Sequence, residues 1–152
     1  MSAAPPAITM TRVIAAAPED VFRAWLDPSL LQRWLAPQPC EVKDVRVDAR
    51  TGGRYAIVVA DPHGNVHTTT GEYLEIVPGR RLVKTWAYEG PFAFDRAASI
   101  VTVDLRELRP GVTELTLTHT QIHDDEGRAG ASAGWVLCLD NLTALLTRPG
   151  AA

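Results

Sequence analysis

The sequence predicts an α+β fold in which a curved antiparallel sheet surrounds one long helix near the C-terminus. Apolar and polar residues alternate from Val42 to Ile122, and two short helical segments precede this region. An apolar stripe at helical spacing follows it, formed by Trp135, Cys138, Leu139, Leu142 and Leu146. A sheet wrapped around a helix that it does not contact everywhere leaves a hollow, and such hollows bind small molecules.

Length and composition predict one globular domain. At 152 residues the chain fits a single core, which we place in residues 8–147, with flexible ends at 1–7 and 148–152. Apolar residues make up 46% of the chain, charged residues 22%, and the net charge is −3. These values give no basic surface for nucleic acid, so we expect no nucleic-acid partner.

The chain shows no targeting or membrane signal. Its first residues lack the cationic and apolar regions of a signal peptide, and no stretch approaches the roughly 20 apolar residues of a membrane span. We therefore expect a cytoplasmic protein without a membrane partner. Cys40 and Cys138 stand in no CxxC or Cys/His cluster, which predicts two reduced thiols and no zinc site.

Two helix starts are visible early in the chain. Ile8 to Ile14 alternates as a first strand, and Pro18 then suits the first turn of a helix whose buried stripe is Val21, Phe22 and Trp25. Asp27-Pro28 repeats the signal, with Asp27 as the cap of a second short helix that carries Leu30, Leu31 and Trp34 and ends before Pro37.

Six further strands follow, separated by short turns that favour an antiparallel meander. The turns contain Gly52-Gly53, Asp61 to Asn65, Pro78-Gly79 and Pro110-Gly111, with a longer loop at Gly90 to Arg96. The predicted strands are Val42 to Val47, Tyr55 to Val59, Val66 to Val77, Leu82 to Tyr88, Ser99 to Leu108 and Val112 to Ile122.

The last helix is predicted with a late start. Gly127, Gly130 and Gly134 each cost roughly 1 kcal/mol relative to alanine in a helix interior, so we expect its stable part to begin near Ser132.

Alternation also predicts which side chains face the interior. The inward residues on the last two strands are Val101, Val103, Leu105, Leu115, Leu117, His119 and Gln121, and earlier strands contribute Tyr55, Ile57, Val59, Leu82, Lys84 and Trp86. For the strand from Val66 to Val77 two registers stand, one with Thr69, Gly71 and Tyr73 inward and one with Thr70, Glu72 and Leu74 inward. We favour the first.

The order and spacing of several motifs resemble the activator-of-Hsp90-ATPase-homologue branch of the SRPBCC superfamily, from about Ile8 to Leu146. The motifs are Pro18-x-x-Val21-Phe22-x-x-Trp25, Asp27-Pro28 through Trp34-x-x-Pro37, Gly52-Gly53-x-Tyr55, Gly71-x-Tyr73-x-Glu75-Ile76-x-Pro78, Leu82-x-x-Thr85-Trp86, Val101-x-Val103-x-Leu105, Thr113-x-Leu115-x-Leu117-Thr118-His119, and Gly134-Trp135-x-x-x-Leu139-Asp140-x-Leu142.

The resemblance implies a helix-grip (START/Bet v 1-like) fold. In such a fold a seven-stranded antiparallel sheet wraps the C-terminal helix, two short helices close one end, and a deep cavity lies between sheet and helix. Members of the superfamily bind lipids, steroids, polyketides and plant hormones, and some cyclise or hydrolyse. The sequence lacks the separate N-terminal domain of the eukaryotic co-chaperone, so we do not expect the Hsp90 role. Lys84 stands where the branch usually has an apolar residue: either it anchors a ligand, or the inward phase of its strand is wrong.

The candidate site residues are those that the predicted registers point into the hollow. Candidates for acid–base catalysis are His119, Tyr73 and Lys84. Structural roles compete with each of these: a core histidine, a tyrosine facing solvent, or a lysine reaching a rim. The predicted ligand-binding residues are Trp34, Tyr55, Ile57, Tyr73, Trp86, Val101, Val103, Leu117, His119, Trp135, Cys138 and Leu139.

No metal or cofactor site is expected. Asp124-Asp125-Glu126 beside His123 lacks the ligand spacing of a calcium loop, and we interpret it as a solvated cap of the last helix. Nucleophile elbows, phosphate loops and dinucleotide fingerprints are missing from the sequence.

Three functions follow, in order of preference. The first is binding of a small, mostly apolar or aromatic molecule, with room left by Gly53, Gly71 and Gly134. The second is a cofactor-free cyclase-like or hydrolase-like enzyme in the same hollow. The third is an interaction module related to the chaperone activator. The sequence leaves a homodimer open.

Overall fold

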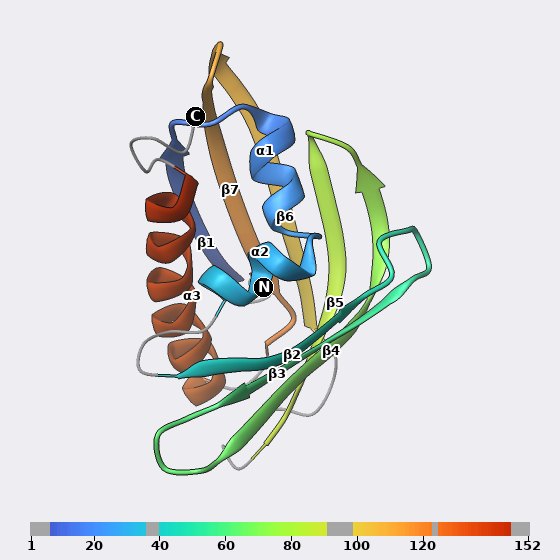
Figure 1. Cartoon of the computed structure of the whole chain (residues 1–152), viewed down its shortest axis with the longest axis vertical. Helices are drawn as coiled ribbons and strands as arrows, with labels where there is room; N and C mark the ends of the chain where they lie inside the picture. Colours follow the sequence, from blue (N-terminus) through green and yellow to red (C-terminus); the bar gives the residue numbers. More distant parts are fainter. Residues whose placement is uncertain (1–6, 36–39, 91–98, 123–124, 147–152) are drawn as a thin grey trace, which may run out of the picture.

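One seven-stranded sheet and three helices make up the described part of the chain (Figure 1). The structure is a computed structural model that describes residues 7–35, 40–90, 99–122 and 125–146. The elements in chain order are β1 (Ala7–Ile14), α1 (Pro18–Ala24), α2 (Pro28–Trp34), β2 (Glu41–Val47), β3 (Arg54–Ala60), β4 (Val66–Val77), β5 (Arg81–Glu89), β6 (Ser99–Arg109), β7 (Val112–Thr120) and α3 (Asp125–Leu146).

The sheet has the strand order β1-β7-β6-β5-β4-β3-β2, and every neighbouring pair is antiparallel. The predicted meander is therefore confirmed from β2 to β7, while β1 returns to lie beside β7. Register irregularities between Val42 and Asp44 and between Tyr73 and Glu75 bend the sheet locally. Figure 1 shows β2, β3 and β4 crossing the end of the molecule at a steep angle to β6 and β7, so that the sheet curves around α3.

The two short helices begin where the sequence predicts. Pro18 and Pro28 occupy the first turns of α1 and α2, and the Asp27 carboxylate accepts the Ser29 backbone N–H at 2.9 Å. Val21, Phe22 and Trp25 are buried as expected. The end of α2 falls at Trp34; Pro37 lies outside the described residues, as does most of the loop from Gly90 to Arg96.

The start of α3 differs from the prediction, because the helix begins at Asp125 rather than near Ser132. The Arg128 guanidinium pairs with Asp125 and donates to the Ile122 carbonyl at 3.0 Å, which ties the first turn to the end of the sheet. These local contacts at the helix start offset part of the low helix propensity of the glycines. Asp125 thus belongs to the helix itself rather than to a loop; His123 and Asp124 are outside the described residues.

By length and composition alone, the 20 residues Gly127–Leu146 of α3 are apolar enough to cross a membrane, contrary to our reading of the sequence. Here α3 is the helix that the sheet surrounds, with Leu139 and Leu142 fully buried. A core helix satisfies the same criterion, because its inner face is apolar for packing.

The predicted registers hold along β3 to β7, with one exception at the end of β7. Gln121 has a φ of 66° and is exposed, whereas we expected it to face inward. A left-handed backbone cannot continue a strand, so β7 ends at Thr120. On β4, Gly71 and Tyr73 are buried, which is the register we favoured.

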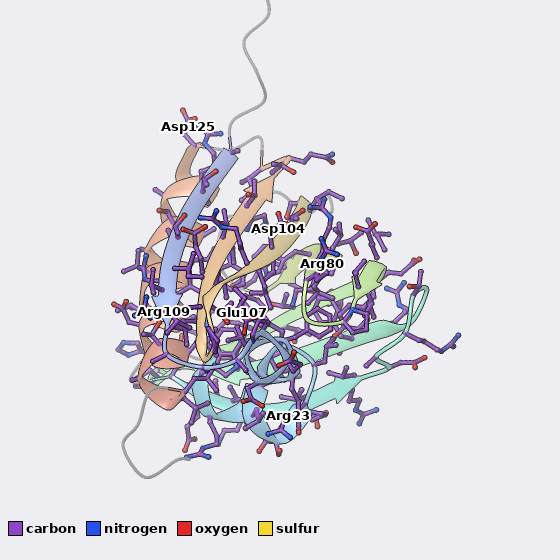
Figure 2. All side chains as sticks on the ribbon, turned by 90° about the horizontal axis from the view of Figure 1, so that it is seen from above. Arg23, Arg80, Asp104, Glu107, Arg109 and Asp125 are labelled. Atoms are coloured by element: carbon purple, nitrogen blue, oxygen red, sulfur yellow. The ribbon has the colours of Figure 1, made fainter. Side chains whose placement is uncertain are left out.

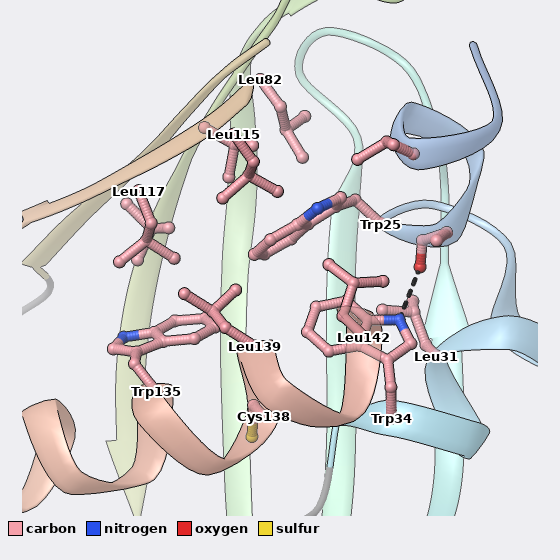
Figure 3. Close-up of a cluster of buried hydrophobic side chains, with 14 of the residues drawn as sticks. Trp25, Leu31, Trp34, Leu82, Leu115, Leu117, Trp135, Cys138, Leu139 and Leu142 are labelled. Atoms are coloured by element: carbon pink, nitrogen blue, oxygen red, sulfur yellow. Dashed lines mark hydrogen bonds between the residues drawn. The ribbon is translucent and has the colours of Figure 1, made fainter. Parts of the chain in front are cut away.

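Three tryptophans form the centre of the core where α1, α2 and α3 meet (Figure 3). The ring of Trp25 lies 4.7 Å from that of Trp34, edge to face, and 5.9 Å from that of Trp135. Trp34 donates its indole N–H to the Ala24 carbonyl at 2.9 Å, which fixes the angle between α1 and α2. Leu139 and Leu142 complete the packing, so this end of the interior is solid.

Most charged side chains in the described ranges are exposed. Arg23, Arg80 and Arg109, which Figure 2 labels, are examples of exposed residues. Lys84 is only 2% exposed and lies inside the molecule.

The three glycines that were expected to leave room have different roles. A Cβ at Gly53 would lie 2.1 Å from the Asp48 carbonyl oxygen, and one at Gly71 would lie 2.0 Å from the Thr85 carbonyl oxygen. Backbone therefore fills the space beside both, and the expectation is wrong for them. At Gly134 a Cβ would meet nothing within 4 Å, so only this glycine leaves open space.

Gly71→Ala and Gly134→Ala should therefore change stability in opposite directions. Gly71→Ala forces the β4 and β5 backbones apart, and we expect a loss of on the order of 2–3 kcal/mol in the free energy of unfolding. Gly134→Ala adds a methyl group in open space within a helix, and we expect a gain of about 1 kcal/mol. Urea unfolding followed by circular dichroism measures both, and similar values for the two variants would contradict this assignment.

Candidate functional site

A cavity of about 300 Å³ lies between the inner face of β3, β4 and β5 and the first half of α3. This is at the lower end of the ~300–1,000 Å³ typical of small-molecule sites. The lining residues are Leu35, Cys40, Tyr55, Ile57, Val59, Asp61, His67, Thr69, Lys84, Trp86, Tyr88, Gly130, Ala131, Gly134, Trp135 and Cys138.

The hollow exists because the facing stripe of α3 carries small residues. Gly130, Gly134 and Cys138 follow one another at a spacing of four residues, with Ala131 beside them, and all four line the cavity. Further along the same helix, the inner positions are leucines that fill the space against the sheet. The interior is therefore solid around the tryptophan cluster and hollow next to the small residues.

Alternate residues of β5 supply one wall. Lys84, Trp86 and Tyr88 all face inward, since side chains two positions apart share a face of the sheet. The rings of Trp86 and Tyr88 are stacked, with centroids 6.4 Å apart and planes inclined by 14°. Together with Trp135 from α3 they give the cavity flat aromatic surfaces.

Lys84 brings a cationic group to the cavity lining. Its ammonium lies 4.4 Å from the ring centroid of Tyr55 and 5.6 Å from that of Trp25. Burial lowers the pKa of Lys84 from 10.5 to about 8. The prediction that Lys84 faces inward is therefore correct.

Asp61, His67 and Tyr88 form a hydrogen-bonded chain along the cavity wall. His67 Nε2 lies 3.0 Å from Asp61 Oδ2, and His67 Nδ1 lies 2.6 Å from the Tyr88 hydroxyl. A carboxylate only accepts, so Nε2 carries a proton, and in the neutral imidazole Nδ1 accepts from the Tyr88 hydroxyl. The hydrogen bond from His67 is the main cause that holds the pKa of Asp61 below its ordinary value. Such a chain orients the Tyr88 hydroxyl and can transmit a proton.

The turn before β4 fixes the carboxylate of this chain. Asp61 Oδ1 accepts the backbone N–H groups of His63 and Asn65 at 2.9 and 3.0 Å, which leaves Oδ2 for His67. The sequence motif Asp61 to Asn65 thus closes a hairpin and positions a side chain at the same time.

His119 lies behind the cavity wall rather than in it. Its Nδ1 accepts the Trp135 indole N–H at 3.1 Å, so the proton of the neutral ring is on Nε2, which lies 2.7 Å from Ser99 Oγ. Ser99 Oγ donates in turn to the Trp86 carbonyl at 3.0 Å. Burial, and secondarily the charge of Lys84, lowers the pKa of His119 to about 4. His119 is therefore a neutral positioning residue that holds two walls of the cavity.

The predicted site residues divide into two groups. Those that line the cavity are Tyr55, Ile57, Trp86, Trp135, Cys138 and the catalytic candidate Lys84. Those that lie outside its lining are Trp34, Tyr73, Val101, Val103, Leu117, His119 and Leu139.

Packing explains the second group. Trp34 is held in the core by its bond to Ala24, and the ring of Tyr73 is packed 5.4 Å from that of Tyr55. Val101, Val103, Leu117 and Leu139 are at most 1% exposed, because the tryptophan cluster and the leucines of α3 cover that part of the sheet. The three catalytic candidates therefore do not meet in one site.

Several residues that line the cavity were not predicted from the sequence. His67 and Tyr88 share the inward phase of Thr69 and Trp86, so the alternation itself was a usable signal. Leu35, Cys40, Asp61, Gly130 and Ala131 gave none, because they lie at turns, at an element end, or on a helix whose start was misplaced.

The two cysteines line the same cavity, and both are free thiols. Burial raises the pKa of Cys138 to about 12 and raises that of Cys40 as well. The Cys138 thiol donates to the Leu35 carbonyl at 3.1 Å. Neither thiol is therefore activated as a nucleophile. Within the described ranges, no group of three or more His, Cys, Asp or Glu residues is arranged to hold a metal ion.

A curved sheet that grips a long helix, with a cavity between them, defines a helix-grip protein of the START/Bet v 1-like (SRPBCC) class. Within this class the chain belongs to the Activator of Hsp90 ATPase homolog 1-like protein family, whose sequence profile matches residues 15–147. Both the fold and the family likeness expected from the sequence are confirmed.

Solved structures from bacteria share the whole architecture. A protein from Chromobacterium violaceum has 35% identity and a TM-score of 0.84, covering 94% of this chain and 99% of its own. A protein from Silicibacter pomeroyi has 26% identity and a TM-score of 0.80, covering 93% and 97%. One from Nitrosomonas europaea has 25% identity and a TM-score of 0.78, covering 96% and 97%. Among curated proteins, none matches the chain.

The position of His119 predicts sensitivity to acid. Its pKa is about 4 in the folded protein against 6.5 ordinarily, so between these values the unfolded chain binds the proton more readily and stability falls as pH decreases. We expect a loss on the order of 2–3 kcal/mol in the free energy of unfolding from pH 7 to pH 4. Urea unfolding at stepped pH measures it.

The matched variant is His119→Gln, which has no group titrating in this range. It should be less stable than the wild type at pH 7, because the Trp135 and Ser99 bonds change, but its stability should depend less on pH. Equal pH slopes for the two proteins would contradict the role of His119.

Proposed function

We propose that this protein binds a small, mostly apolar molecule in the cavity between the sheet and α3. The observation that carries the proposal is the open space beside Gly134, at the centre of a lining made largely of apolar and aromatic side chains. A leucine at this position would fill the space and stabilise the helix, so a glycine here is costly unless the space has a use.

Hydrogen bonds hold the walls of the cavity in place, which favours ligand binding. His119 and Ser99 fix the indole of Trp135 and the backbone of Trp86 by hydrogen bonds. A wall held in this way keeps its shape when the cavity is empty, which reduces the ordering cost of binding.

An enzyme built on His119, Tyr73 and Lys84 receives less support. Only Lys84 lines the cavity; His119 is engaged on both nitrogens, and burial raises the pKa of Tyr73 above its ordinary range. The chain Asp61–His67–Tyr88 is the arrangement in this cavity through which a proton can move, so any acid–base chemistry belongs there.

Support for a chaperone-activator role is weaker still. The large apolar side chains that are exposed in the described ranges are spread over β1, β4, β6 and α3, without a shared groove to receive a partner. They are Val13, Val66, Leu74, Val77, Leu108, Val136 and Leu137. For the compartment we propose the cytoplasm, on the ground of the two free thiols.

Filling the cavity at Gly134 should weaken binding without unfolding the protein. We use 2-naphthamide, a neutral flat aromatic probe, and isothermal titration calorimetry. Gly134→Leu should weaken binding roughly tenfold or more, because the leucine occupies the space of the probe. The matched control is Ala133→Leu, which adds the same side chain at the exposed neighbouring position of α3 and should leave the affinity unchanged. Equal affinity in the two variants would contradict binding in this cavity.

A further inference from the structure

Lys84 is a buried cation without an ionic partner. It is 2% exposed, it lines the cavity, and it takes part in no hydrogen bond or ion pair within the residues that the structure describes. The groups nearest to its ammonium are the ring faces of Tyr55 and Trp25. The Tyr55 hydroxyl donates to the Thr85 carbonyl at 2.6 Å, and it is the ring of Tyr55, not its hydroxyl, that contacts the ammonium.

Burying an ammonium without an acceptor is unfavourable, and aromatic faces compensate for only part of that cost. The other lysine of the chain, Lys43, follows the usual pattern: it is exposed and pairs with Glu41 at 2.7 Å. Asp61 is the carboxylate among the described residues of the cavity lining, and it is bound by His67 and by the backbone of its own turn. The cavity wall formed by the described residues therefore provides no counter-ion for Lys84.

The charge and surroundings of Lys84 define the chemistry that would complete the site. A single ammonium is neutralised by a single negative charge, whereas a doubly charged phosphate would leave excess charge in a mostly apolar cavity. The remaining walls are the aromatic rings of Trp86, Tyr88 and Trp135. A carboxylate attached to a flat apolar body satisfies both requirements.

We propose that the ligand is a small apolar monocarboxylate whose carboxylate binds the Lys84 ammonium while its apolar body lies between Trp86 and Trp135. This inference rests on the proposed function and specifies its ligand class. Lys84 thus acts as the anchor of the bound molecule.

Of the titratable groups in contact with Lys84 or in the same cavity lining, Asp61 stays ionised, whereas Tyr55, Tyr73, Cys138 and His119 stay uncharged through neutral and mildly alkaline pH. Burial raises the pKa of Tyr55 and of Tyr73 above the ordinary value, raises that of Cys138 to about 12, and lowers that of His119 to about 4. Lys84, with a pKa of about 8, is the group among these that loses its charge in this range. Affinity for a carboxylate should therefore decrease as the pH rises through about 8.

The test compares 2-naphthoate with 2-naphthamide, which have the same shape and differ in charge. Calorimetric titration of the wild type at pH 7 should give roughly 10- to 100-fold tighter binding of the naphthoate. Lys84→Met should remove this preference and leave naphthamide affinity equal or higher. The same variant should raise the melting temperature of the ligand-free protein, because it replaces an unpaired buried charge with an apolar chain of similar length.

Lys43→Met is the matched control, since it removes the same charge from the exposed face of β2 and should keep the preference for naphthoate. Equal affinity of the wild type for the two probes, or a preference that survives in Lys84→Met, would overturn the inference and leave the proposed function standing. Failure of the wild type to bind either probe would overturn both.

Discussion

The size of the side chains on the inner face of α3 determines where this molecule is solid and where it is hollow. Large residues, Leu139 and Leu142, meet the tryptophan cluster and fill one end. Small residues, Gly130 and Gly134, face β3 to β5 and leave the cavity. Because protein interiors are otherwise close-packed, a gap of this size beside a rigid helix exists only where the sequence withholds side chains. The site, its aromatic walls and its buried lysine all depend on that gradient.

The two buried basic residues, His119 and Lys84, have different roles. His119 is kept neutral by burial and by the nearby charge of Lys84, and it uses both ring nitrogens to hold walls. Lys84 lines the cavity, and its ammonium has no hydrogen-bond or ion-pair partner among the described residues. One group therefore builds the cavity and the other gives it polarity. The free energy of unfolding is therefore lower than it would be with an apolar residue at Lys84, and such a loss of stability is common at ligand-binding sites.

The sequence predicted the architecture well because alternation is a local property. Strand registers, including the inward phase of Lys84, follow from period-two patterns, and the caps at Pro18 and Asp27 follow from backbone chemistry. Which inward residues line the cavity is not local. Trp34 lies in the core because its indole finds the Ala24 carbonyl, and His67 meets Tyr88 because β4 pairs with β5 in the register Thr69 to Tyr88. These contacts depend on how several elements pack together, and a short stretch of sequence does not determine that packing.

The place of β1 in the sheet has a consequence for biosynthesis. β1 is synthesised before the other six strands of the sheet, yet it stands at the edge of the sheet and pairs with β7, joining Ala7 to Thr120. Its Arg12 also reaches Asp140 on α3, at 3.5 Å. While the intervening strands are being translated, β1 has no neighbour to bind, and its hydrogen-bonding edge is open to other chains. Closure of the sheet must therefore await the synthesis of β7, which makes the nascent chain, rather than the folded domain, the stage most exposed to misassembly.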